Sequence, residues 1–134
     1  MRVVGLLVLG LLSGCTSDAL YTYCTDGVQC GERTYNNGDD DEYEVLLECI
    51  EVSVEVEPGR TTRGNHCTIS CFGSGDCDSR VGLADGRCIT LTGETESFCY
   101  QRCDDGVQCY PSSTCETLNL SGGDVRVCLP TRTP

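Results

Sequence analysis

Lysine and tryptophan are absent from this sequence, and phenylalanine, methionine and histidine occur only two, one and one times. The nine basic residues are therefore all arginines, and they face twenty-one acidic residues, which gives a formal net charge of −12 at pH 7. Nucleic acid and anionic lipid headgroups repel such a chain because they carry charge of the same sign. We expect no nucleic-acid partner. The acidic surface suits cations, basic proteins or simple solubility.

No apolar run in the sequence is long enough to cross a membrane. The run Val3–Leu12 has ten residues, and as a helix it spans about 15 Å, half of a bilayer core of about 30 Å. Following Met1-Arg2, it is typical of the apolar segment of a secretory signal peptide. We therefore expect the rest of the chain to lie outside the cytoplasm.

A short motif closes this apolar run: Leu12, Ser13, Gly14 and Cys15. It resembles the lipobox of bacterial lipoproteins, in which a leucine and two small residues precede an obligatory cysteine. The resemblance implies that residues 1–14 are a signal peptide, that cleavage occurs before Cys15, and that Cys15 carries a diacylglyceryl group on its sulfur and an acyl chain on its amine. Because Thr16 rather than an aspartate follows, it also implies the outer membrane. An ordinary signal peptide with a chance cysteine is the alternative.

Cysteine is unusually frequent, and its count is odd. The chain has thirteen, and if Cys15 carries lipid, 13 − 1 leaves twelve, which can all pair. Twelve in the 120 residues that remain after removal of residues 1–14 (134 − 14) is the frequency of disulfide scaffolds. Thiols outside the cytoplasm are oxidised. Because aromatic and aliphatic residues are too few for one conventional core, we expect disulfides to contribute roughly 2–4 kcal/mol each.

The twelve cysteines form an internal repeat of three units. Each unit opens with two cysteines separated by five residues, as in "CTDGVQC" and "CDDGVQC", and three residues join each unit to the next. Chance would not preserve both spacings. The units are Cys24, Cys30, Cys49 and Cys67; Cys71, Cys77, Cys88 and Cys99; and Cys103, Cys109, Cys115 and Cys128. They divide the mature chain into a tether at 15–23, repeats at 24–67, 71–99 and 103–128, and a tail at 129–134.

Each unit is predicted to end in a β-hairpin. In the first, valines alternate with acidic or polar residues over 50–57, which indicates a half-buried strand that ends at Pro58-Gly59. The second folds about Gly93-Glu94 and sets Ile89 opposite Phe98.

The third hairpin is predicted to turn at Gly122-Gly123. In that register Cys128 lies opposite Thr117 rather than Cys115, so a disulfide between the third and fourth cysteines does not fit this unit. We favour bonds from first to third and from second to fourth cysteine in every unit, and pairing between units stays open.

These patterns predict a small, disulfide-rich fold dominated by β-hairpins and loops, without substantial helix in the mature chain. Units two and three are too short to fold by hydrophobic burial alone, and their short joints predict a stubby, semi-rigid rod. The cysteine spacing loosely resembles the small repeats of the EB-module and Dickkopf amino-terminal type. That likeness covers about one unit at a time and implies no function.

No set of residues with catalytic or metal-binding chemistry stands out. Zinc sites favour closely spaced cysteine pairs, but the even count and oxidising compartment favour disulfides, so we expect no metal and no cofactor. His66 is the only histidine. It lies beside Cys67 after an apparent turn and without a serine or metal motif around it, so we expect a surface turn residue and no enzyme activity.

Two exposed segments have a weaker claim to function. The acidic run at 39–44 offers oxygen ligands for Ca²⁺ from Asp39, Asp41 and Glu42, although consecutive acids do not follow the EF-hand pattern. Arg60 or Arg63 could be the specificity residue of a protease-inhibitor-like loop.

The sequence therefore favours a lipid-anchored bacterial lipoprotein of the cell envelope, in the outer membrane, whose stapled repeats form a non-enzymatic binding module. Its partners would be the membrane, through the N-terminal lipid, and a protein or an envelope polymer. A protease-inhibitor-like protein and a structural envelope component are the alternatives.

The anchor hypothesis makes a prediction about the native protein. Its mass should show acyl groups on Cys15 and no free thiol, and Cys15→Ala should shift the protein from the membrane fraction to the soluble fraction because the lipid supplies the attachment. Mass spectrometry and cell fractionation measure both effects. A mature chain that carries no fatty acid, or that titrates with several free thiols, would contradict the hypothesis.

Overall fold

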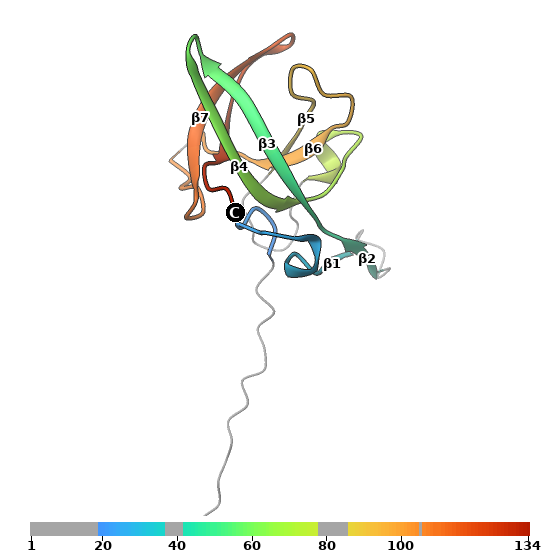
Figure 1. Cartoon of the computed structure of the whole chain (residues 1–134). Helices are drawn as coiled ribbons and strands as arrows, with labels where there is room; N and C mark the ends of the chain where they lie inside the picture. Colours follow the sequence, from blue (N-terminus) through green and yellow to red (C-terminus); the bar gives the residue numbers. More distant parts are fainter. Residues whose placement is uncertain (1–18, 37–41, 78–85, 105) are drawn as a thin grey trace, which may run out of the picture.

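Four β-hairpins make up the fold in the computed structural model, which describes residues 19–36, 42–77, 86–104 and 106–134 (Figure 1). Each hairpin is a separate two-stranded antiparallel sheet. The strands are β1 (Glu32–Asn36), β2 (Glu42–Leu46), β3 (Glu48–Glu57), β4 (Arg60–Thr68), β5 (Gly86–Ile89), β6 (Phe98–Gln101), β7 (Ser113–Leu120) and β8 (Gly123–Pro130). The helical residues in these ranges belong to two 3-10 turns, η1 (Gly27–Gln29) and η2 (Ser74–Asp76). The predicted class, disulfide-rich and hairpin-dominated, is confirmed.

The hairpin of β3 and β4 follows the predicted alternation. Val52 is buried and Val54 and Val56 are half-buried, whereas Glu55 is exposed. The strand ends at the predicted Pro58-Gly59 turn, and β4 begins at once. The first unit also contains the hairpin of β1 and β2, which the sequence analysis did not predict. Across the described part of the chain, no helix is long and apolar enough to span a bilayer.

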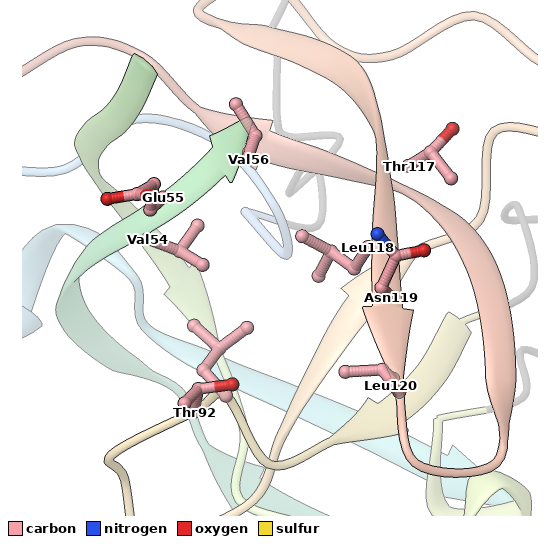
Figure 2. A pocket seen from close by; sticks show the side chains of 9 residues that line it. Val54, Glu55, Val56, Thr92, Thr117, Leu118, Asn119 and Leu120 are labelled. Atoms are coloured by element: carbon pink, nitrogen blue, oxygen red, sulfur yellow. The ribbon is translucent and has the colours of Figure 1, made fainter. Parts of the chain in front are cut away.

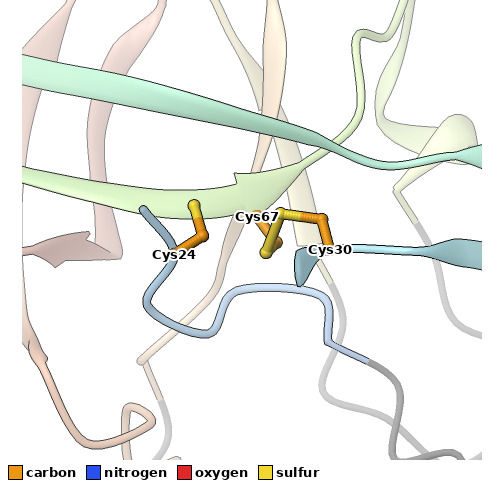
Figure 3. A group of neighbouring side chains, drawn as sticks. All are labelled: Cys24, Cys30 and Cys67. Carbon is orange, nitrogen blue, oxygen red and sulfur yellow. A yellow bond between two sulfur atoms is a disulfide. The ribbon is translucent and has the colours of Figure 1, made fainter. Parts of the chain in front are cut away.

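One disulfide arrangement recurs in all three units. The first cysteine bonds to the third and the second bonds to the fourth, as the sequence analysis favoured: Cys24–Cys49, Cys30–Cys67, Cys71–Cys88, Cys77–Cys99, Cys103–Cys115 and Cys109–Cys128. In the hairpin that closes each unit, the third and fourth cysteines face each other across the two strands. The short loop between the first two cysteines is therefore fastened over the base of a hairpin, as Figure 3 shows for Cys24, Cys30 and Cys67.

The predicted register of the third hairpin is wrong by two residues. The turn lies at Ser121-Gly122, so Leu120 faces Gly123 and Cys115 faces Cys128. A shift of two residues leaves every side chain on the same face of the sheet, so apolar alternation cannot detect it. The predicted disulfide pairing is therefore correct, although the register from which it was inferred is not the one in the structure. Ile89 does face Phe98 in the second hairpin, as predicted.

The three units share their apolar interior and do not form the rod that their short joints predict. One buried cluster combines the first two units, from Leu20 and Leu47 to Ile69 and Cys77. A second cluster joins all three units, and its fully buried members include Val52, Tyr100 and Val127. The modules are too small to bury their apolar residues separately, and they do so against one another.

The C-terminal residues return to the first unit and lie against β4. The Asn65 N–H donates to the carbonyl oxygen of Arg132 at 2.9 Å, and the Arg132 guanidinium lies 4.2 Å from the ring centroid of Tyr23. Gly64 permits this approach, because a Cβ at this position would lie 2.6 Å from the backbone carbon of Pro130. The first and third units are thus held together by the C-terminal segment.

This contact predicts that Gly64→Ala destabilises the protein by about 1–3 kcal/mol, because the backbone of residues 130–132 would have to move away from the added methyl group. Urea unfolding with the disulfides intact measures the effect. Gly122→Ala is the matched control, since a Cβ there meets no atom of the described residues within 4 Å. Equal stability of the two variants would contradict the account.

Candidate ligand-binding groove

The cysteine clusters offer no metal site within the described residues. In each unit three sulfur atoms lie within 4.8 Å of one another, a distance that would suit zinc ligands. All twelve cysteines from Cys24 to Cys128 are in disulfides, and a disulfide sulfur has no thiolate to give to a metal. The clusters are stacked disulfides that fix the loops.

His66 is buried, and the expectation of a surface turn residue was wrong. It lies on β4, where alternate residues face the interior, and only 2 % of its surface is exposed. Its ring contacts those of Tyr21 and Tyr100, at centroid distances of 6.4 and 5.4 Å, and its Nε2 atom has no hydrogen-bond partner among the described residues. Burial lowers the pKa of His66 to about 3. The ring is a neutral core residue, out of reach of any substrate.

Arg60 and Arg63 lie on β4 and are engaged in ion pairs. The Arg63 guanidinium contacts Glu51 on the neighbouring strand at 2.8 Å. Arg60 donates two hydrogen bonds of 2.9 Å to the Glu116 carboxylate on β7, and a third to Glu57. These bonds hold the pKa of Glu116 below its usual range. Arg60 therefore links the first unit to the third, and neither arginine is presented on a free loop as a protease substrate residue would be.

The remaining predicted sites fall largely outside the described residues. Leu12, Ser13, Gly14 and Cys15 precede them, and Asp39 and Asp41 lie in the undescribed segment 37–41. Glu42 is the first residue of β2. The lipid anchor and the Ca²⁺ ligands stay predictions.

Two adjoining hollows form a groove among the hairpins. One, of about 90 Å³, lies between β3, β7 and the segment after β5. The other, of about 470 Å³, continues between β5 and the turn of β7 and β8. They share Thr92, Asn119 and Leu120. The hairpin turns of β3–β4 and β7–β8 lie at one end of the molecule, and the first described residues lie at the other (Figure 1). The groove is on the side of the turns.

The lining of this groove, to which we give the name strand groove, is aliphatic with polar groups, and Glu55 is the charged residue among them. In Figure 2, Leu118 points toward Val54, while Glu55 and Thr117 point away from the space between them. Hydroxyl and amide groups line the larger hollow: Thr90, Thr92, Asn119 and Ser121. Such groups can bond to the N–H and C=O of an extended chain while the aliphatic residues contact its side chains.

Four strands line the strand groove, β3, β5, β7 and β8, and three of them have unpaired outer edges. Among the described residues, β6 and β8 each accept one further bridge, from Ser70 to Phe98 and from Arg102 to Val127. No bridge forms on the outer edges of β3, β5 or β7 in the same part of the chain. An unpaired strand edge is a row of free N–H and C=O groups that another extended chain can join.

Comparison with known proteins does not assign a class to this site: no family model, no curated protein and no solved structure matches the chain. The sequence analysis did not predict the strand groove, because its lining comes from three separate units. The alternation of Ile50–Glu57 and the two predicted hairpins that follow it each marked one wall, but no local pattern indicated that these walls come together.

The burial of His66 predicts a loss of stability in mild acid. The unfolded chain binds a proton at the ordinary pKa of 6.5, whereas the folded protein binds it at a pKa of about 3. Between these values the unfolded state holds more protons, so the contribution of the neutral ring is complete above pH 6.5 and falls as the pH decreases toward 3. By about pH 4.5 the loss would be about 3 kcal/mol.

Urea unfolding at a series of pH values measures this loss. His66→Leu should flatten the dependence between about pH 6.5 and pH 4.5, because leucine has no proton to bind while the carboxylates still titrate as in the parent protein. An unchanged slope in His66→Leu would show that His66 does not govern it.

Proposed function

We propose that this protein is a lipid-anchored, non-enzymatic binding module of the bacterial cell envelope, and that its strand groove binds an extended, basic segment of a partner protein. The anchor would be Cys15 in the outer membrane, as the motif Leu12–Cys15 implies. The stapled hairpins would hold the groove away from the lipid, since the turns lie opposite the first described residues (Figure 1).

The observation that carries the proposal is that three of the four strands that line one groove, β3, β5 and β7, have unpaired edges. A segment that adds itself to β3, β5 or β7 would gain main-chain hydrogen bonds from a ladder that is already formed. The disulfides fix these strands before binding, so little conformational entropy remains to be lost by the protein.

The charge of the protein favours a basic segment. The net charge is −12, and β3, one wall of the strand groove, carries an outward row of acids. Glu51 and Glu57 are each paired with an arginine, whereas Glu55 takes part in none of the ion pairs among the described residues. A cationic segment would be steered toward this wall, and it would meet the Glu55 carboxylate at the rim of the groove, where the side chain points outward (Figure 2).

A short peptide that alternates lysine and valine tests the proposal. It should bind the full-length protein with an affinity that falls as salt increases, measured by isothermal titration calorimetry. Glu55→Arg should weaken binding about tenfold, since it replaces an attraction at the groove by a repulsion.

Glu32→Arg is the matched control, because it makes the same change of charge on β1, which contributes nothing to the groove lining. It should bind the peptide within about twofold of the parent protein. If both variants weaken binding equally, the interaction depends on net charge alone and not on the groove. If the parent protein does not bind the peptide, the proposal that a basic segment occupies the groove is wrong.

A further inference from the structure

The two hollows of the strand groove differ in what lines them. The smaller hollow lies between β3 and β7, and in Figure 2 Leu118 and Leu120 extend from β7 to the side on which Val54 lies. The larger hollow has hydroxyl and amide groups in its lining. Five aliphatic side chains line the smaller hollow: Val54, Val56, Leu91, Leu118 and Leu120. It therefore favours an apolar group, and the larger hollow suits the polar main chain of a ligand.

The size of the smaller hollow limits what can enter it. A cavity of about 150 Å³ holds a benzene molecule. The smaller hollow has about 90 Å³, which in proportion leaves room for roughly three or four carbon atoms. An extended main chain does not fit into this space, and neither does a phenyl ring. A branched aliphatic side chain of the size of valine does fit, and apolar atoms would surround it.

The larger hollow borders outward main-chain groups of β5. The Cys99 N–H on β6 donates to the Ile69 oxygen at 3.0 Å, so it points away from β5. Two residues that face each other in an antiparallel pair point their N–H and C=O groups either both toward the partner strand or both away from it. Cys88 faces Cys99 and lines the larger hollow. Its N–H and C=O groups therefore point away from β6, along the unpaired edge of β5.

The opposite wall of the larger hollow has main-chain groups of the same kind. The Arg126 oxygen on β8 accepts a hydrogen bond from the Cys103 N–H at 3.2 Å. Thr117 faces Arg126, so its N–H and C=O groups point away from β8. Asn119, two residues further along β7, has the same orientation and lines both hollows. An extended segment in the larger hollow would pass between the outward groups of Cys88 and those of Asn119.

Acidic side chains lie next to the lining residues of the larger hollow. Glu94 follows Thr92 by two residues, and Asp124 lies between Gly123 and Val125, and both acids are exposed. Neither takes part in the ion pairs among the described residues. Successive side chains of an extended segment point to opposite faces. If one side chain enters the smaller hollow, its two neighbours point outward, where the acidic charge favours basic residues.

We propose that the strand groove selects its occupant by a single aliphatic side chain. The main chain of the bound segment lies in the larger hollow, between the edges of β5 and β7, and one side chain of the size of valine enters the smaller hollow with a basic residue on each side of it. This inference rests on the proposed function, to which it adds a recognition pattern of basic, aliphatic and basic residues. It also assigns main-chain pairing to β5 and β7 rather than to β3.

Peptides with one variable position test the selection. Each peptide alternates lysine with serine, except that the central serine is replaced by valine, alanine, threonine or phenylalanine, so all four have the same charge. The valine peptide should bind the full-length protein most tightly in isothermal titration calorimetry. Alanine should bind about tenfold more weakly because it lacks two methyl groups. Threonine, which has the shape of valine with a buried hydroxyl, and phenylalanine, which is too large, should bind at least as weakly as alanine.

A variant of the protein locates the selecting hollow. Val56 is half-buried and lines the smaller hollow only, so Val56→Phe should fill it, and the tenfold preference for valine over alanine should fall to within about twofold. Val107→Phe is the matched control, because Val107 is exposed and lies outside the lining of both hollows. It should keep the tenfold preference. The absence of free thiols in each variant confirms that its disulfides have formed.

The outcomes separate this inference from the proposed function. If the four peptides bind the parent protein equally well, or if Val56→Phe keeps the full preference for valine, selection by the smaller hollow is wrong while binding of a basic segment stands. If neither the valine peptide nor the alternating lysine–valine peptide binds, the proposed function fails, and the selection fails with it. The peptide series on the parent protein decides the question even if Val56→Phe does not fold.

Discussion

The fold depends on one constraint, the pair of crossed disulfides that fastens a short loop over the base of a hairpin in each unit. The six bonds close separations of 12 to 37 residues. Because each bond reduces the conformational entropy of the unfolded chain, it contributes roughly 2–4 kcal/mol to the free energy of unfolding. This contribution is large for units that bury so little apolar surface. The loops and the bases of the hairpins take their positions from these bonds.

Interactions between the units then turn three stapled hairpins into one body. The shared cluster around Val52, Tyr100 and Val127 lies where the hairpins converge. The close approach at Gly64 and the ion pair of Arg60 with Glu116 join the first unit to the third without passing through the second. The strand groove exists because the hairpins converge: no single unit contains its three walls.

Local patterns were sufficient to predict the hairpins that close the units, because alternation along β3 and the spacing of cysteines are properties of neighbouring residues. The register of the third hairpin was not accessible in this way, since a slip of two residues keeps Leu118 and Val127 on the same face. The burial of His66 and the packing of the units could not be predicted locally, because they depend on contacts between distant segments. His66 was also misplaced because the arginine-rich stretch 60–63 before it resembles a turn in sequence. The strand groove was missed for the same reason.

The position of the sulfur pairs has a consequence for how this architecture can vary. Because the third and fourth cysteines face each other at the base of the hairpin that closes each unit, the strands beyond them carry no part of the crosslink. An even number of residues could be added at any tip without disturbing the crosslinked base or exchanging the inner and outer faces. The length of each hairpin, and with it the contact surface at its tip, can therefore change without affecting the rigidity of the disulfide-bonded base.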